Sequence, residues 1–260
     1  ITLEVEDDQL VTDTDTVVVT VFSGAGGEPV TVTSRVNNGD DDVEELASNG
    51  SMYLTSSDLE LVYDDYAGGN QIIGLRFNNV NVPQGVQIQE ATIQFTVDET
   101  DSGTTNLTIT GQATDNAGAF STSSYNVSSR TQTAASSNWS PPAWNSVGAA
   151  GADQKTPNLA AIVTEIVGRS GWSLGNSMVF FVEGSGERTA ESYNGSSSSA
   201  PLLSITYLTP GSSNEDPVAD AGNDQTVTDT DLSGSETVTL DGSGSTDSDG
   251  SIVAYTWKEN

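Results

Sequence analysis

The chain has 260 residues, of which 37 are acidic and 7 basic, giving a formal net charge of −30 at pH 7. So negative a surface repels nucleic acids and anionic lipids and favours divalent cations, so no nucleic-acid partner is expected. Cys and His are both absent, which excludes disulfides, thiol nucleophiles, zinc sites and histidine general bases. No apolar run has membrane-spanning length, so no membrane insertion is expected.

Residues 1–22, ITLEVEDDQLVTDTDTVVVTVF, alternate apolar and polar side chains on both sides of an acidic turn. A period of two residues predicts two β-strands. The alternation is under way from the first residue, so we expect the chain to be processed or part of a longer polypeptide. Residues 23–29, SGAGGEP, have the composition of a flexible linker.

Residues 30–208 contain repeated strand patterns, such as QIIGLRFNNV, ATIQFTVDE and SMVFFVEG, separated by turns rich in Gly, Asn, Asp and Ser. These features predict an antiparallel jelly-roll β-sandwich. One segment, TPNLAAIVTEIVGRSGW, instead predicts a short helix. Thr156 is its expected N-cap, Pro157 its first residue, and Gly168 or Gly171 its end. The fold class is therefore all-β with one short helix.

A second linker, residues 209–216, leads to short β patterns in residues 217–260. Three motifs there, ADAGNDQTV, VTLDGSGSTDSDGSI and YTW, occur in the order and at the spacing of a polycystic-kidney-disease (PKD) repeat. Residues 217–260 therefore resemble the first half of such a repeat, and residues 1–22 resemble its last strands. The resemblance implies an immunoglobulin-like sandwich, typical of extracellular spacers and adhesive modules, that is split between the chain ends.

Half of a sandwich leaves unpaired strand edges and an uncovered apolar face. We expect the two ends not to fold back on each other within the chain, although a closed monomer is the alternative. The missing strands would then come from copies of the same protein, joined head-to-tail as a covalent tandem repeat or by strand exchange. The residues expected to form the shared core of this joint are Val17, Val19, Val21, Ile252, Ala254 and Trp257.

The middle of the chain also resembles a known module. Its motifs SSDLELVYD, IIGLRFNNVNVPQG, TPNLAAIVTEIVGRSGW and APLLSITY resemble a jelly-roll module of secreted and surface-anchored bacterial proteins, similar to carbohydrate-binding and DNRLRE-type domains. This resemblance covers nearly all of residues 30–208. It implies a β-sandwich with calcium sites and does not specify a ligand.

Two dense groups of acids in the middle of the chain suggest calcium, which is bound by six to eight oxygen ligands. A solvated acidic loop is the alternative. The expected calcium ligands in this region are Asp40, Asp41, Asp42, Glu44, Glu45, Asp58 and Glu60. Near the chain ends, Asp247, Asp249, Asp7 and Asp8 are further candidates that could meet at a subunit junction. For Asp247 and Asp249 a simple turn between strands is favoured.

Trp139 and Trp144 flank a Pro-Pro turn, with Tyr125 nearby in the sequence. They could form an aromatic surface that stacks on sugars, but such tryptophans more often fill the end of a sandwich core. Asn-X-Ser/Thr tripeptides at Asn49, Asn106, Asn126 and Asn194 are candidate glycosylation sites. A fifth, at Asn138, is disfavoured by the proline that follows it.

Arg76, Arg130 and Arg188 could line a polar pocket, but in a chain with so few basic residues internal pairing with carboxylates is expected. No acid stands in an apolar setting that would raise its pKa, so no enzymatic activity is expected. The sequence thus predicts a structural subunit or repeat of an extracellular prokaryotic filament or surface stalk, stiffened by calcium. The alternative is a carbohydrate-binding adhesion module that binds polysaccharide.

Overall fold

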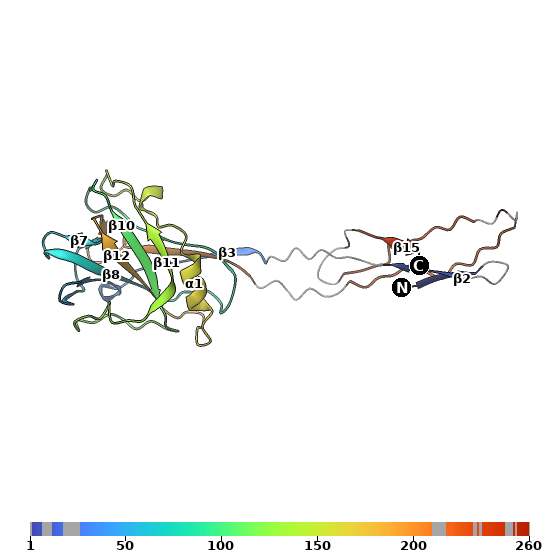
Figure 1. Ribbon diagram of the computed structural model, residues 1–260, viewed down its shortest axis with the longest axis horizontal. Coiled ribbons are helices and arrows are strands. Elements are labelled where there is room, and N and C mark those ends of the chain that lie inside the picture. Colours follow the sequence, from blue (N-terminus) through green and yellow to red (C-terminus); the bar gives the residue numbers. More distant parts are fainter. Residues whose placement is uncertain are drawn as a thin grey trace. The chain divides into compact units, whose positions relative to one another are not determined.

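The computed structural model describes residues 2–6, 12–17, 27–209, 217–230, 233, 236–247, 252 and 254–259. The chain divides into two units (Figure 1). Glu28–Pro210 form one unit, called the body below, and Ile1–Gly27 with Gly211–Asn260 form the terminal unit. Strands and a single α-helix make up the regular structure of the described residues, apart from two short 3-10 turns, which confirms the predicted all-β fold with one short helix.

The first layer of the body is an antiparallel sheet with the strand order β11-β10-β12-β8-β4-β5, in which β7 also pairs with β8. Its strands are β4 (Asp42–Leu46), β5 (Met52–Tyr53), β7 (Tyr63–Asp64), β8 (Gly69–Phe77), β10 (Asn106–Gln112), β11 (Gln132–Trp139) and β12 (Met178–Ser185). The 3-10 turn η1 (Gly39–Asp41) directly precedes β4.

The second layer combines two smaller antiparallel sheets. One has the order β3-β14-β9, and the other pairs β13 with β6. Their strands are β3 (Pro29–Arg35), β6 (Asp58–Glu60), β9 (Ile88–Gln94), β13 (Thr189–Glu191) and β14 (Leu202–Leu208). A bridge from Val97, just beyond β9, to Ala190 of β13 connects the two sheets.

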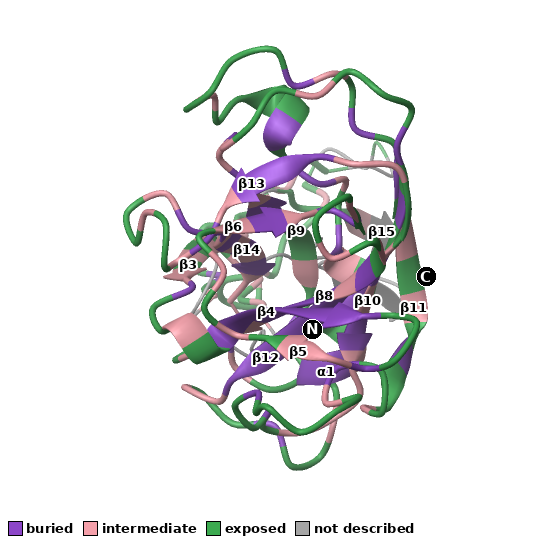
Figure 2. Ribbon diagram, turned by 90° about the vertical axis from the view of Figure 1, so that its left-hand side faces the viewer, coloured by how far each residue is buried: buried purple, intermediate pink, exposed green. Residues whose placement is uncertain are grey.

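Burial along the strands follows from their place in this sandwich. Strand β14 alternates, with Leu203, Ile205 and Tyr207 buried and the residues between them half-buried, as expected for a strand with one face on the core. The start of β12, in contrast, is buried on both faces (Figure 2). Its second face is covered by the segment 113–131, where Phe120 and Val127 pack on Val179 and Phe181.

The main core lies between the two layers and is rich in aromatic residues. Phe95 stacks on Trp139 with ring centroids 5.7 Å apart, and Trp139 contacts Trp144 at 6.4 Å. Phe77 meets Phe180 edge-on at 5.9 Å. Such pairs contribute ~0.5–1.5 kcal/mol each beyond the area that they bury.

Helix α1 (Ala160–Val167) closes one side of the core with Ile162, Val163, Ile166 and Val167. It packs so close to β10 that a Cβ at Gly111 would lie 2.7 Å from Ile162. The predicted start of the helix was wrong, because the Thr156 hydroxyl accepts a hydrogen bond from the backbone N–H of Ile93 in β9. Asn158 instead accepts the N–H of Ala160 at the helix start.

In the terminal unit, β1 (Thr2–Glu6), β2 (Thr12–Val17) and β15 (Trp257–Glu259) form a sheet of the order β1-β2-β15. Trp257 lies opposite Val17 in this antiparallel pairing. The expectation that the two ends do not fold back on each other is therefore wrong for this structure. The physical reason is that β15 belongs to the same chain as β2. Its effective concentration near the edge of β2 therefore does not depend on the protein concentration.

The structure tests only part of the predicted joint. Val17 and Trp257 are paired, and the Trp257 and Ile252 side chains are half-buried. Ala254 is exposed, so its predicted place in a shared core is wrong. Val19 and Val21 lie outside the described residues.

Arg188 is a buried hub of the body, with 1% of its surface exposed. Its guanidinium donates to the carbonyls of Gly103, Pro141 and Pro142, and it pairs with Asp101 at 3.2 Å. Arg76 likewise pairs with Asp41 at 2.7 Å, so these two predicted pairings with carboxylates are confirmed. Arg130 donates mainly to backbone carbonyls and stacks on Phe120.

We expect Arg188→Met to lower the free energy of unfolding of the body by about 3–5 kcal/mol, because it leaves buried acceptors unpaired. Arg169→Met is the matched control. It removes the half-exposed pair of Arg169 with Asp115, which is worth at most about 1 kcal/mol. Urea unfolding of both variants measures the difference, and equal losses would contradict the role given to Arg188.

Candidate metal centre

Strand β6 and its neighbour β13 place two acids side by side. Asp58, the first residue of β6, lies directly opposite Glu191, the last residue of β13. Residues paired in this way point to the same face of a sheet, with Cβ atoms ~5 Å apart. Like charges directly opposite each other are destabilising unless something neutralises them.

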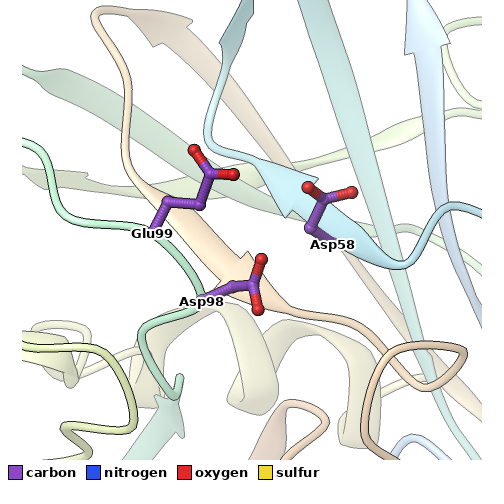
Figure 3. A group of neighbouring side chains, drawn as sticks. All are labelled: Asp58, Asp98 and Glu99. Carbon is purple, nitrogen blue, oxygen red and sulfur yellow. The ribbon is translucent and has the colours of Figure 1, made fainter.

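Two further acids come from the segment after β9. The backbone N–H groups of Asp98 and Glu99 both donate to the carbonyl of Thr189 in β13, at 3.0 and 3.4 Å. This docks both residues beside β13, and their carboxylates turn toward that of Asp58 (Figure 3). One carboxylate oxygen from each of Asp58, Asp98 and Glu99 lies within 4.8 Å of the others. We call Asp58, Asp98, Glu99 and Glu191 the outer acidic cluster.

The electrostatics of the outer acidic cluster show mutual repulsion. Burial and the negative charge of Asp58 raise the pKa of Asp98. Burial and the charge of Asp98, with which it shares a hydrogen bond, raise the pKa of Glu191. The ion pairs of the described residues are Arg76–Asp41, Arg169–Asp115 and Arg188–Asp101, and none of them includes a member of this cluster.

A second group of acids lies inside the sandwich. Glu44 of β4 accepts the backbone N–H of Glu60 in β6 at 2.9 Å, and the two carboxyl groups also hydrogen-bond each other. Burial, followed by the Glu60 carboxyl, raises the pKa of Glu44 well above its ordinary value. Asp64 of β7 accepts a hydrogen bond from the side chain of Gln71 at 3.0 Å.

The outer acidic cluster offers oxygen atoms only, which suits a hard cation such as calcium better than a transition metal. The carboxylates of Asp58, Asp98 and Glu99 come from two separate segments of the body and lie partly exposed, where an ion can enter from solvent. The residues therefore fit a calcium ion. Its chemical effect would be to neutralise the carboxylates and to hold β6 and the segment after β9 together.

The predicted calcium loop at residues 40–45 is wrong, because these residues form η1 and β4 and their side chains diverge. Asp41 is bound to Arg76, and Asp40 is exposed. Glu45 points to the opposite face from Glu44 and accepts the backbone N–H groups of Val127 and Ser128. Alternation along a strand, which separates neighbouring side chains, is the physical reason.

Asp58 and Glu60 were predicted as calcium ligands, and the structure brings Asp58 together with Asp98 and Glu99. The latter two were missed by the sequence reasoning. The available signal was their position just after a strand, in FTVDE, where side chains leave the sheet edge. Nothing local indicates that this edge meets β6.

The candidate ligands near the chain ends are not part of these groups. Asp247 belongs to the terminal unit rather than to the body. Asp7, Asp8 and Asp249 lie outside the described residues, so their predicted meeting at a joint stays a prediction.

The predicted sugar-stacking surface is wrong for both tryptophans. Trp139 and Trp144 are 5% and 0% exposed and pack with Phe95 in the core. The Trp144 indole N–H donates to the carbonyl of Asp153, which fixes the ring there. Tyr125 is exposed and lies next to Gly50. It does not stack on either tryptophan ring.

The candidate glycosylation sites differ in accessibility. Asn49, Asn106 and Asn194 are exposed. Asn126 is half-buried, and its side-chain oxygen accepts hydrogen bonds from Ser121 and Arg130. Glycosylation at these positions stays a prediction.

The sequence matches no protein-family model and no curated protein. The resemblances to PKD repeats and DNRLRE-type modules therefore rest on the quoted motifs. Within the described residues, no helix combines the length and the hydrophobicity needed to cross a lipid bilayer.

Asp42 provides a pH-dependent test of the buried charges. It is 4% exposed, accepts the backbone N–H of Tyr193 at 2.6 Å, and has its pKa raised by burial to about 7. The structure thus overturns the expectation that no acid lies in an apolar setting. Between pH 4 and 7 the folded state holds a proton that the unfolded state has lost, so stability falls as pH rises.

We therefore expect Asp42→Asn to gain stability relative to the original chain as pH rises, by about 1.4 kcal/mol per pH unit between pH 4 and 7. The asparagine oxygen still accepts the Tyr193 N–H but cannot ionise. Urea unfolding in calcium-free buffer measures the difference, with Asp40→Asn at an exposed position as the control for lost charge. Identical pH profiles for the two variants would contradict the burial effect.

Proposed function

We propose that the chain is a calcium-stabilised structural module of an extracellular filament or surface stalk. The observation that carries this proposal is the convergence of Asp58, Asp98 and Glu99 within 4.8 Å, without an ion pair to a basic residue of the described chain. Carboxylates so close repel one another, and a cation between them turns that repulsion into attraction. Extracellular modules commonly bind calcium with Kd values of ~10⁻⁴–10⁻³ M, which suits an exposed site.

Calcium would also provide a stabilising crosslink in a chain that cannot form disulfides. A secreted protein often uses disulfides to stabilise its fold, and this chain has no cysteine. An ion held by β6 and the segment after β9 would crosslink parts of the body that are 40 residues apart in the sequence, Asp58 and Asp98. By mass action, saturating calcium at 100 times its Kd would add about 2.7 kcal/mol to the free energy of unfolding.

The double substitution Asp98→Asn with Glu99→Gln removes two negative charges. It should change the stability of the body in opposite directions in two buffers. In chelator, the double variant should be more stable than the original chain, because the repulsion is reduced. In millimolar calcium it should be less stable, because the ion no longer binds. Thermal unfolding in each buffer and calorimetric titration with calcium measure both effects.

Glu90→Gln with Asp153→Asn is the matched control, since it removes the same charge from exposed positions of the body. It should keep the calcium response of the original chain. A double variant at Asp98 and Glu99 that binds calcium as tightly as the original chain would overturn the proposed site.

The filament part of the proposal uses the pairing of β2 with β15. The same pairing can form within one chain or between neighbouring copies, and the contacts are identical in both. Closure within the chain, as seen here, removes the argument that unpaired edges force copies together. What supports assembly is that the pairing joins two separate ends through a strand of only three residues, so opening it breaks few backbone hydrogen bonds.

A cysteine pair at directly opposed positions distinguishes closure from exchange. Thr16 lies opposite Lys258, and the chain has no cysteine of its own. Thr16→Cys with Lys258→Cys should, on oxidation at high protein concentration, give a ladder of disulfide-linked oligomers on a non-reducing gel.

The control is Thr12→Cys with Lys258→Cys, because β15 pairs only with Asp15, Thr16 and Val17 of β2, so Thr12 lies beyond this pairing and should crosslink poorly. Crosslinked monomers as the only product of the Thr16 and Lys258 pair, at every concentration, would overturn head-to-tail assembly by strand exchange. They would leave the calcium site of the body untouched.

On this proposal the module is not an enzyme. The acids with the largest pKa increases, Asp42 and Glu44, are 4% and 2% exposed, so a polymeric substrate does not reach them. A carbohydrate-binding role also loses its main support, because the two tryptophans expected to stack on sugars are in the core.

A further inference from the structure

Strand β3 has one open edge. In its antiparallel pairing with β14, the backbone N–H of Val36, just after β3, donates to the carbonyl of Pro201. Along such a ladder, residues that bond to the neighbouring strand alternate with residues whose peptide groups point away from it. Arg35, Thr33 and Thr31 therefore turn their backbone N–H and C=O groups to the free edge. None of these groups has a hydrogen-bond partner in the part of the chain that the structure describes.

The other strand edges of the body are covered or short. The side chains of Asn158 and Thr156 accept backbone N–H groups of β9, and the Glu165 carboxylate of α1 accepts two N–H groups of β11 at 2.9 and 2.8 Å. Glu44 covers β6, the bridge from Val97 covers β13, and β5 has only two residues. Among the described strands of the body, β3 is thus the long edge strand without such a cover.

The sequence of β3 does not protect this edge. An unpaired edge is a template for another strand, and proteins usually block it with charged side chains, an internal proline or a β-bulge. Strand β3, PVTVTSR, has its only proline at the first position and pairs with β14 without a shift of register. Its alternating Val and Thr residues favour β-structure. The edge is therefore suited to receive a further strand along its length.

The charge pattern around β3 favours a second copy of the chain as the source of that strand. Strands β3 and β14, seven residues each, contain no acidic residue, although 37 of the 260 residues of the chain are acidic. The one acid within this three-stranded sheet is Glu90 of β9, which β14 separates from β3. Two chains with a net charge of −30 repel each other. They approach with least repulsion through an acid-free edge such as this one.

We propose that β3 pairs antiparallel with β3 of a second copy, so that two three-stranded sheets join across a two-fold axis. With Val32 opposite the same residue of the second copy, the two strands overlap along their whole length. Thr31 of each copy then lies opposite Thr33 of the other, and the peptide groups that face the free edge pair with each other. Because the contact is two-fold, it closes at two copies.

This inference goes beyond the proposed function and does not depend on the calcium site. The paired strands run in opposite directions, so Pro29, the first residue of β3, lies at opposite ends of the joined pair. Head-to-tail links between chain ends could then continue from each copy. The β3 contact would join two such filaments side by side.

The test is the mass of the full chain, measured by sedimentation velocity over a range of protein concentrations. The original chain should form dimers. Thr31→Lys with Thr33→Lys places like charges directly opposite each other in the proposed pair, so this variant should lose the dimer. Both side chains are exposed, so the circular dichroism spectrum should not change. If the variant fails to fold, Thr33→Pro removes an N–H at the free edge without removing a hydrogen bond to β14.

Thr108→Lys with Thr110→Lys is the matched control. It adds the same charge to β10, which is paired on both sides by β11 and β12. It should form dimers as the original chain does. A chain that is monomeric at every concentration would overturn the proposal and leave the edge of β3 to a strand of another protein. Dimers that persist in the Thr31 and Thr33 variants would also overturn it, because another surface would then form them.

A disulfide experiment distinguishes this contact from head-to-tail exchange. Thr31→Cys with Thr33→Cys should give crosslinked dimers on oxidation, since Cα atoms of directly opposed residues are ~5.5 Å apart. The product should stop at dimers. Ser204→Cys with Thr206→Cys, on the central strand β14, is the control and should give none. Absence of dimers in the β3 variant would overturn the β3 contact without affecting the pairing of β2 with β15.

Discussion

The stability of the body depends on how its buried and half-buried carboxylates are neutralised. Folding brings Asp58 of β6 together with Asp98 and Glu99 of the segment after β9 and buries Glu44 of β4, and none of the arginine–carboxylate pairs of the described residues includes these acids. Removing a carboxylate from water is costly unless a proton or a cation accompanies it. Without a cation, the structure must hold protons on groups such as Glu44. The net charge of −30 makes this a property of the whole chain, because few basic residues are left to compensate.

Apolar residues could not simply replace these acids, since several of them complete the hydrogen bonding of strand edges. Glu44 accepts the N–H of Glu60 where β6 has no strand beside it, and Glu45 accepts two N–H groups of the segment that covers the outer face of the sheet. An apolar side chain would leave these buried N–H groups unpaired at ~1–3 kcal/mol each. The same side chains therefore hold the layers together and carry the charge that must be neutralised. The calcium ion proposed above would neutralise part of that charge.

Local pattern predicted the strand-rich body and the helix, because both depend on periodicity within a short segment. It failed where distant segments meet. Asp98 and Glu99 follow a strand in a common way, and the long-range contacts of their segment with β13, the bridge from Val97 to Ala190 and the hydrogen bonds to Thr189, place them near Asp58. The acids of residues 40–45 were predicted to form a calcium loop because they are so close in the sequence. That prediction did not take into account that side chains alternate between the two faces of β4. Trp139 and Trp144 could be assigned to the core or to a surface from sequence alone, and burial in the structure decides for the core.

The connection between the units explains why the chain ends pair with each other. Leu208 of β14 lies opposite Pro29 of β3, and Thr209 donates its N–H to the Glu28 carbonyl. The chain therefore enters and leaves the body at neighbouring points, so folding of the body brings Glu28 and Thr209 together. The residues of the body then no longer count toward the loop between β2 and β15, which lowers the entropic cost of closing it. If calcium stabilises the body, its loss would release this restraint, and strand exchange between copies would then compete with closure on more equal terms.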